Sequence, residues 1–178
     1  FLIDSGEQLE LLEHKIVWPT PAYFRLTEEA RQLANVRVGI VGLGSVGSKI
    51  AVSLARSGVR RFLLVDDDYI APGNMVRHEL SWAYTGTHKA RAVRDALSLI
   101  AAGVQVDTRI TRLAGQESAV TAAAALKDLS NCDLLIDATA NPEVFLLLAA
   151  LAKRHGASLC WGEIFAGGFG GMIARARQ

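Results

Sequence analysis

Runs of apolar residues alternate along the chain with longer stretches in which apolar residues recur at helical spacing. Short runs rich in Val, Ile and Leu, or a strict alternation of apolar and polar residues, predict strands. The predicted strands cover residues 36–41, 60–66, 104–111, 133–137, 158–165 and 171–177. Because helices are predicted between most of them, we expect an α/β fold: a Rossmann-like, largely parallel sheet with helices on both faces.

The first two predicted helices of this domain have ends that the sequence marks. Thr27 is a candidate N-cap for a short helix. The next helix carries Val46, Ile50 and Leu54 on one apolar face, and Gly58 follows where a left-handed residue ends a helix.

The later helices are marked in the same way. The third helix is predicted over residues 88–101, before Gly103, and an alanine-rich helix precedes the fourth strand. The last helix has Asn141 at the N-cap position, Pro142 in its first turn and Gly156 just past its end. The inward positions expected for the third helix are Ala90, Val93, Leu97 and Ile100.

Length, charge and hydropathy narrow the class of protein. A chain of 178 residues fits one domain, here residues 26–178, after an arm over residues 1–25 that mixes a short helix with irregular chain. The net charge is +1, so no global field favours nucleic acid or anionic lipid, and we expect neither as a partner. The longest apolar run, 144–152, is shorter than the roughly 20 residues of a membrane-spanning helix.

Two cysteines, Cys132 and Cys160, lie far apart in the sequence, beside or inside apolar runs. This placement predicts buried, reduced thiols and not a disulfide framework or a zinc site. A reducing compartment, the cytoplasm, is therefore the expected location.

The segment GLGSVG follows a predicted strand and opens a helix. In it Gly42 permits a sharp turn, Gly44 lets a phosphate approach the backbone, and Gly47 packs the helix on its strand. By itself the pattern also fits a simple tight turn. Asp66 ends the next strand, nineteen positions beyond Gly47, where a carboxylate accepts hydrogen bonds from ribose hydroxyls. Together the loop and the acid predict a nucleotide site.

Polar residues after this second strand point to a triphosphate. Arg77 offers a planar fork for phosphate oxygens, and Lys89, near a helix start, offers a point charge. Asn74 adds an amide, whereas Asp68 fits either the site or a solvated strand end, and Asp67 is expected to be solvated. A plain nicotinamide-binding domain has no reason to carry these cations, so we predict Arg77 and Lys89 to be catalytic and to lie over one pocket.

Four motifs at these separations resemble a known family. They are VGIVGLGSVGS, LLVDDDYIAPGNMVRHEL, TGTHKARAV and DLLIDATANPEV, and they resemble the adenylyltransferases of the ThiF, MoeB and HesA type, whose nucleotide domain is shared with ubiquitin-activating enzymes. The resemblance covers residues 36–177. It implies that ATP and Mg²⁺ bind, and that the C-terminal carboxylate of a ubiquitin-like or sulfur-carrier protein attacks the α-phosphate, giving an acyl-adenylate and pyrophosphate.

Residue roles follow from the resemblance. It implies that Asp66 takes the ribose, that Asn74 and Arg77 line the nucleotide site, and that Lys89 contacts the phosphates. The set expected at the nucleotide is Gly42, Gly44, Gly47, Asp66, Asp68, Asn74, Arg77 and Lys89. The resemblance also implies a homodimer and a domain that continues past residue 178.

One position departs from the family pattern. Where relatives usually carry an aspartate that holds Mg²⁺, this chain has Ala140, whose methyl group cannot coordinate a hard cation. Three explanations are open. Another acid, Asp137 or Glu163, supplies the missing oxygen; or the chain has weakened catalytic activity; or it binds nucleotide without turnover. No cysteine motif for a thioester step is visible in the sequence.

Two other functions fit parts of the sequence. The glycine loop and Asp66 alone fit an NAD(P)-dependent oxidoreductase equally well. Ala140 fits a nucleotide-binding or scaffold subunit that has lost catalysis. The leading prediction remains an ATP-dependent adenylyltransferase.

Overall fold

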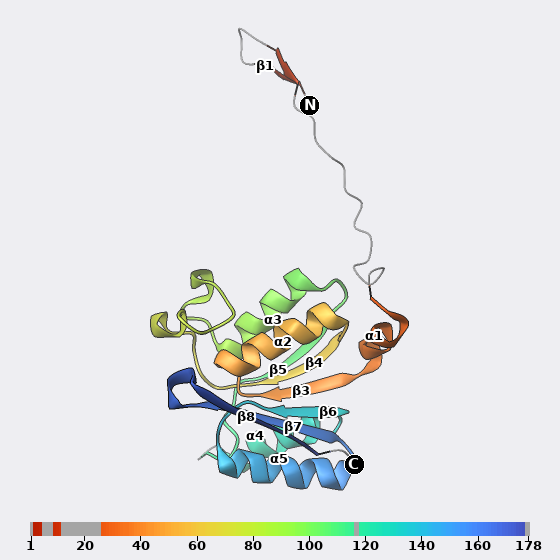
Figure 1. Cartoon of the computed structure of the whole chain (residues 1–178), viewed down its shortest axis with the longest axis vertical. Helices are drawn as coiled ribbons and strands as arrows, with labels where there is room; N and C mark the ends of the chain where they lie inside the picture. Colours follow the sequence, from red (N-terminus) through yellow and green to blue (C-terminus); the bar gives the residue numbers. More distant parts are fainter. Residues whose placement is uncertain (1, 5–8, 12–25, 116–117, 177–178) are drawn as a thin grey trace.

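A computed structural model describes residues 2–4, 9–11, 26–115 and 118–176, and its centre is a six-stranded sheet (Figure 1). The strand order is β5-β4-β3-β6-β7-β8, with every neighbouring pair parallel except the last. The strands are β3 (Arg37–Val41), β4 (Arg61–Val65), β5 (Gln105–Arg109), β6 (Leu134–Asp137), β7 (Ser158–Phe165) and β8 (Gly170–Ala176). The prediction of a largely parallel sheet is confirmed.

Helices cover both faces of the sheet. α2 (Ser45–Ser57) and α3 (Lys89–Ile100) lie on one face, and α4 (Ala119–Leu129) and α5 (Pro142–His155) lie on the other (Figure 1). A fifth helix, α1 (Glu28–Gln32), precedes β3, and short 3₁₀ turns η2 (Leu33–Asn35), η3 (Pro72–Asn74), η4 (Trp82–Tyr84) and η5 (Ala166–Gly168) lie in the connections. This arrangement is the Rossmann-like α/β fold that the sequence predicts.

Side chains on the two faces of each central strand pack into two separate hydrophobic cores. In β4, Phe62 and Leu64 pack in the cluster with α2 and α3, whereas Leu63 and Val65 pack in the cluster with α4 and α5. All four side chains are at most 1% exposed. A strand buried on both sides gains from apolar residues at every position, and this is why β4 is a continuous apolar run in the sequence.

The predicted helix ends are confirmed. The Thr27 side chain accepts a hydrogen bond from the amide of Ala30 at the start of α1. Gly58 and Gly156, just after α2 and α5, have the left-handed φ angles of 118° and 71°. Asn141 caps α5 by accepting a hydrogen bond from the Glu143 amide at 2.9 Å.

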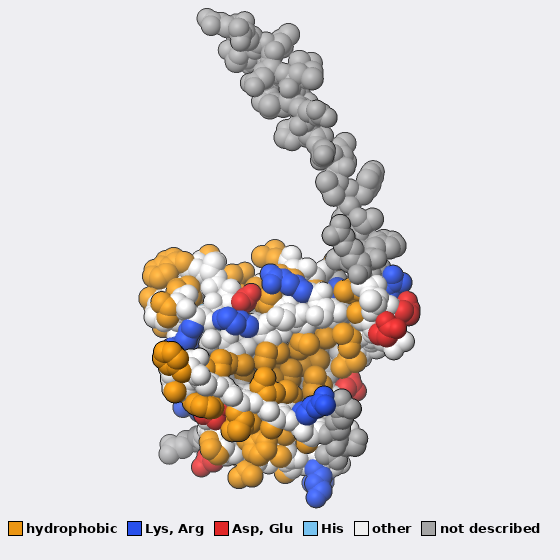
Figure 2. Space-filling view, viewed as in Figure 1, with side chains coloured by type: hydrophobic (Ala, Val, Ile, Leu, Met, Phe, Trp, Pro, Cys, Tyr) orange, Lys and Arg blue, Asp and Glu red, His pale blue; other side chains and the backbone are white. Residues whose placement is uncertain are grey.

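The buried face of α2 differs from the one predicted. Its fully buried residues are Gly47, Ser48, Ala51, Val52 and Ala55, whereas Val46, Ile50 and Leu54 are only half-buried. Small side chains allow the helix to lie close to the sheet, and the larger residues then flank the contact. On the side of the molecule that Figure 2 shows, hydrophobic side chains gather in the region between α2 and β8.

The first residues of the chain form strands and not the short helix that we expected there. β1 (Leu2–Asp4) pairs antiparallel with β2 (Leu9–Leu11). The rest of the predicted arm, residues 1, 5–8 and 12–25, lies outside the described residues. Among the helices that the structure describes, none combines the length and the apolar character needed to cross a membrane.

Candidate functional site

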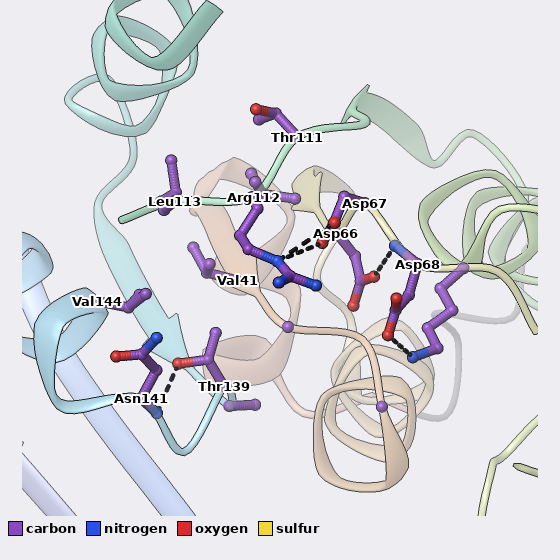
Figure 3. A pocket seen from close by; sticks show the side chains of 15 residues that line it. Val41, Asp66, Asp67, Asp68, Thr111, Arg112, Leu113, Thr139, Asn141 and Val144 are labelled. Atoms are coloured by element: carbon purple, nitrogen blue, oxygen red, sulfur yellow. Dashed lines mark hydrogen bonds and ion pairs between the residues drawn. The ribbon is translucent and has the colours of Figure 1, made fainter. Parts of the chain in front are cut away.

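A cavity of about 320 Å³ opens at the carboxyl ends of β3, β4 and β6 (Figure 3). The chain's path through the sheet reverses between β3 and β6, and ligands of open α/β sheets bind outside such a reversal point. The lining residues are Val41, Gly42, Gly44, Val65, Asp66, Asp67, Asp68, Lys89, Thr111, Arg112, Leu113, Ala138, Thr139, Asn141 and Val144.

The three loop glycines have three different environments. Gly42 has a φ of 83°, and a side chain there would meet the Ala138 backbone at 2.9 Å. A Cβ on Gly47 would lie 1.9 Å from the Gly42 carbonyl oxygen, so Gly47 lies behind the loop and lets α2 close onto it. A Cβ on Gly44 would meet nothing within 4 Å, because Gly44 borders the open cavity. The first turn of α2 begins at this point and presents backbone N–H groups there.

Asp66 joins the glycine loop to the end of β4. Its Oδ2 accepts a hydrogen bond from the Leu43 amide at 2.6 Å, and its Oδ1 accepts one from the Asp68 amide at 2.8 Å. Burial raises the pKa of the Asp66 carboxyl, and these two N–H groups work against that rise. The carboxylate is therefore held at the cavity wall, and its remaining lone pairs can accept further hydrogen bonds.

Asp68 and Lys89 form an ion pair on the same wall. The Lys89 ammonium lies 2.8 Å from Asp68 Oδ2 (Figure 3) and is largely buried, with the whole residue 8% exposed. The Lys89 amide also donates to the Asp68 carbonyl, so two contacts fix the start of α3 beside β4. The hydrogen bond from Lys89 lowers the pKa of the Asp68 carboxyl. A buried ammonium at a cavity wall is a point charge suited to an anionic ligand.

His78 fixes the segment between β4 and α3 against the glycine loop. Its Nε2 lies 2.9 Å from the Leu43 carbonyl oxygen, and its Nδ1 accepts a hydrogen bond from the Leu80 amide at 3.2 Å. Since Nδ1 accepts, Nε2 carries the proton and donates. Burial is the main reason why the pKa of His78 is lowered. Leu43 is thus held twice, through its carbonyl by His78 and through its amide by Asp66.

The segment after β5 contributes residues that we did not predict. Arg112 lies across the cavity, and its Nε is 3.3 Å from an oxygen of Asp67 (Figure 3). Asp67 is therefore paired and not merely solvated. Thr111 and Leu113 line the cavity on either side of Arg112. The signal that we overlooked is positional, because β5 is parallel to β4 and its carboxyl end must lie at the same edge.

The structure places Arg77 in a second cavity of about 450 Å³. Its carbonyl oxygen accepts hydrogen bonds from the Ser45 hydroxyl at 3.0 Å and from the Lys49 ammonium. The lining residues are Ser45, Val46, Arg77, Ala138, Ala140, Gly162, Glu163, Ile164, Gly167 and Gly168. Because Ala138 lines both cavities, the two adjoin, and the predicted basic pair is divided between neighbouring cavities.

Asn74 also lies away from the first cavity. Its Oδ1 accepts a hydrogen bond from the Ala71 amide at 3.0 Å and closes the turn η3. Of the set predicted at the nucleotide, the structure brings Gly42, Gly44, Asp66, Asp68 and Lys89 together around the first cavity.

Asp137 is the last residue of β6, and Ala140 lies in the connection from β6 to α5. Ala140 has a left-handed φ of 55°, a conformation in which Asp and Asn are several-fold enriched among non-glycine residues. Asp137 is fully buried and lines neither cavity, and its Oδ1 accepts hydrogen bonds from the Thr139 hydroxyl at 2.7 Å and amide at 3.0 Å. Burial raises the pKa of the Asp137 carboxyl.

The cysteines lie in the packed parts of the domain. Cys132 is buried, and burial raises the pKa of its thiol to about 11. Cys160 is half-buried within β7. Cys132 agrees with the prediction of a buried core thiol, and a thiol with a raised pKa is a poor nucleophile at neutral pH, whereas Cys160 is less buried than predicted.

The fold, the glycine turn and the acid at the reversal point together define a Rossmann-like α/β domain. The chain belongs to the ThiF family, whose family model matches residues 22–175.

Relatives in this family carry names that indicate different functions. The chain is 33% identical over 123 residues to the "ATP-dependent ubiquitin transferase-like protein Cap2" of Enterobacter hormaechei, covering 69% of this chain and 20% of Cap2. It is 29% identical over 136 residues to the "Probable adenylyltransferase/sulfurtransferase MoeZ" of Mycobacterium tuberculosis, covering 76% of this chain and 33% of MoeZ.

Solved structures share the fold. The crystal structure of E. coli MccB with ATP superposes with a TM-score of 0.66 at 20% identity, over 76% of this chain and 39% of that chain. The chain therefore spans well under two thirds of the length of each of these three proteins.

Proposed function

We propose that this chain is the nucleotide-binding domain of an ATP-dependent adenylyltransferase. Its second substrate is the C-terminal carboxylate of a ubiquitin-like or sulfur-carrier protein, which becomes an acyl-adenylate. Membership of the ThiF family supports this reaction class, and the similarity to Cap2 and MoeZ supports the two kinds of carrier.

The observation that carries the proposal is the wall of the first cavity. An open glycine at the N-cap of a thirteen-residue helix and a buried ammonium border one space of about 320 Å³. Backbone N–H groups and a fixed cation bind phosphate oxygens without rearrangement. The apolar side chains of Val41, Leu113 and Val144 on the opposite wall suit a nucleobase.

The reaction transfers an adenylyl group. A carboxylate oxygen of the carrier forms a bond to the α-phosphorus of ATP, and the bond between that phosphorus and the bridging oxygen of pyrophosphate breaks. No proton is needed, since pyrophosphate leaves as an anion. Lys89 and Arg77 stabilise the charge that grows on the phosphate oxygens, Asp66 accepts hydrogen bonds from the ribose, and catalysis is mostly alignment and charge neutralisation.

Mg²⁺ belongs to this proposal as the ion that accompanies ATP. When bound, this ion would neutralise charge on the phosphate oxygens. Within the described ranges, no group of three or more His, Cys, Asp or Glu side chains is arranged to hold a metal ion. The phosphates themselves supply most ligands of a nucleotide-bound Mg²⁺, so a single carboxylate of the chain is enough.

The expected assembly and location complete the proposal. A homodimer is proposed from the family resemblance, and light scattering on the full-length protein tests it. We place the reaction in the cytoplasm, a reducing compartment in which Cys132 and Cys160 would stay free thiols.

Calorimetric titration of the full-length protein with ATP and with NADH tests the nucleotide assignment. We expect ATP to bind, and the variant Lys89→Ala to lose at least about tenfold in ATP affinity, or about 1.4 kcal/mol, because a charge-assisted contact to phosphate is lost. Lys153→Ala is the matched control, since Lys153 is an exposed residue in the last turn of α5.

Pyrophosphate exchange with candidate carrier proteins tests the chemistry. We expect exchange that depends on the carrier's free C-terminal carboxylate. Tight NADH binding that Lys89→Ala leaves unchanged contradicts the proposal and favours an oxidoreductase. ATP binding without exchange for any carrier favours the scaffold function that Ala140 suggests.

A further inference from the structure

The acids that line the two adjoining cavities differ in their contacts. In the first cavity Asp66 accepts two backbone N–H groups, Asp67 pairs with Arg112, and Asp68 pairs with Lys89. Each of these carboxylates thus has a structural partner in the folded chain. A cation that bound there would have to replace or share an existing contact.

Glu163 is different. It is the only acid among the residues that line the second cavity, it is half-buried, and no hydrogen bond or ion pair joins its side chain to another residue in the described part of the chain. It lies on β7, two positions past Trp161, which pairs with the last residue of β6. β7 therefore extends beyond β6 and carries Glu163 to the edge of the sheet where the ligand cavities open.

Ala140 lines the same cavity as Glu163. The residue at 140 comes from the connection after β6, and the one at 163 comes from the neighbouring strand. Ala140 holds a left-handed φ of 55°, in which its methyl group is strained and a short acidic side chain is better tolerated. The cavity lining thus includes a methyl group in a backbone conformation typical of Asp or Asn, and a carboxylate that has no hydrogen-bond or ion-pair partner among the described residues.

We propose that Glu163 is the carboxylate that holds the divalent cation of the nucleotide in this chain, so that the acid is supplied by β7 and not by the connection after β6. The inference rests on the proposed function. Glu163 would hold the cation from the second cavity, which adjoins the proposed phosphate site in the first cavity at Ala138.

Charge and ligand chemistry agree with this assignment. Mg²⁺ in nucleotide sites takes one or two carboxylate oxygens, with phosphate oxygens and waters completing the shell. Arg77 and Ser45 line the same cavity, and Ser45 is the first residue of α2, whose N-terminal end faces the proposed phosphates. The cavity therefore offers one anionic ligand for the metal and one cation for the phosphates.

The assignment is tested by measuring ATP affinity of the full-length protein by calorimetry, in Mg²⁺ and in EDTA. For the unsubstituted protein we expect Mg²⁺ to strengthen ATP binding. Glu163→Gln should weaken binding at least about tenfold in Mg²⁺ and leave the affinity in EDTA unchanged, because it removes a metal ligand and keeps the shape. Glu143→Gln, an exposed acid of α5 outside both cavities, should change neither value.

A second substitution tests the position of the acid. In Glu163→Gln, the added change Ala140→Asp should restore the Mg²⁺-dependent affinity, since it returns a carboxylate to the same cavity. Equal ATP affinity of Glu163→Gln and the unsubstituted protein in Mg²⁺ overturns the assignment, and so does a loss that is just as large in EDTA. Failure of the unsubstituted protein to bind ATP in either buffer contradicts the proposed function itself.

Discussion

At the scale of single residues, the glycine loop shows that one motif can have several physical causes. Gly42 is required for its backbone angle, Gly47 for the close approach of a carbonyl oxygen, and Gly44 leaves the cavity open. The sequence spacing predicted all three positions, and the geometry agrees with the reasons predicted for Gly42 and Gly47. Ala140 was recognised as a departure, but its left-handed backbone was not predictable, because nothing in the sequence marks alanine for positive φ.

The two glycines that differ most in surroundings give a matched pair of variants. Gly47→Ala places a methyl group 1.9 Å from a carbonyl oxygen, so we expect the free energy of unfolding to fall by about 3 kcal/mol. Gly44→Ala meets no atom and keeps a negative φ of −73°, so stability should change by less than about 1 kcal/mol.

ATP affinity separates the roles of the same pair. We expect Gly44→Ala to weaken ATP binding at least about tenfold, because the methyl group enters the space proposed for a phosphate. Urea denaturation and calorimetry measure the two quantities. A Gly44→Ala variant that binds ATP as tightly as the original chain would place the phosphates elsewhere.

At the scale of elements, the segment from β4 to α3 is shaped by polar contacts more than by regular structure. Its backbone is closed by hydrogen bonds from Ile70 to Thr87, from Gly86 to Ile70 and from Lys89 to Asp68. His78 attaches its middle to the glycine loop. The sequence identified the residues of this segment but did not determine the course of its backbone. For this reason we expected Arg77 and Lys89 in one pocket, whereas they line two adjoining cavities.

His78 makes the stability of this attachment depend on pH. Burial lowers its pKa below the ordinary value of about 6.5, so the unfolded chain takes up a proton at a pH where the folded chain does not. The stabilisation that comes from keeping His78 neutral is complete above pH 6.5. It is lost as the pH falls through the pKa that His78 has in the folded chain. We expect the free energy of unfolding to drop by up to about 1.4 kcal/mol per pH unit in that window.

Denaturation at several pH values, with His78→Gln as the reference, measures this effect. The difference between the two profiles removes the shared contribution of other groups, including the carboxyl of Asp66. A difference that does not vary between pH 5 and 7 would show that His78 does not change its protonation on unfolding.

At the scale of the whole molecule, the sheet and its helices were predictable and the site only in part. Strands such as β4 are apolar on both faces, and helices such as α5 carry an N-cap and a final glycine, so local sequence determines these elements. The cavity depends on which strand ends become neighbours. Arg112 follows β5, more than forty positions after Asp67, and only the sheet order brings the two within 3.3 Å.

The start of the domain can be tested by truncation. Leu33 and Val36 pack against the core cluster of α2 and α3, and Ala30 lies against Gly58, where its carbonyl oxygen is 2.5 Å from an added Cβ. A chain that begins at residue 26 should keep the unfolding free energy of the longer chain. A chain that begins at residue 36 should lose about 2 kcal/mol, because it exposes this apolar contact.

Thermal and urea unfolding of the two shortened chains decide the boundary. Equal stability of both would mean that α1 is not part of the cooperative unit. A chain from residue 26 that no longer unfolds in one transition would move the boundary toward the N-terminus.

The wall around Ala138 has a consequence for how two ligands share this molecule. Ala138 lines both cavities, so the nucleotide and the cation that we propose for them would share this residue as a neighbour. Thermodynamic reciprocity then fixes the outcome for the proposed ligands: whatever factor the cation adds to the affinity of the nucleotide, the nucleotide adds to the affinity of the cation.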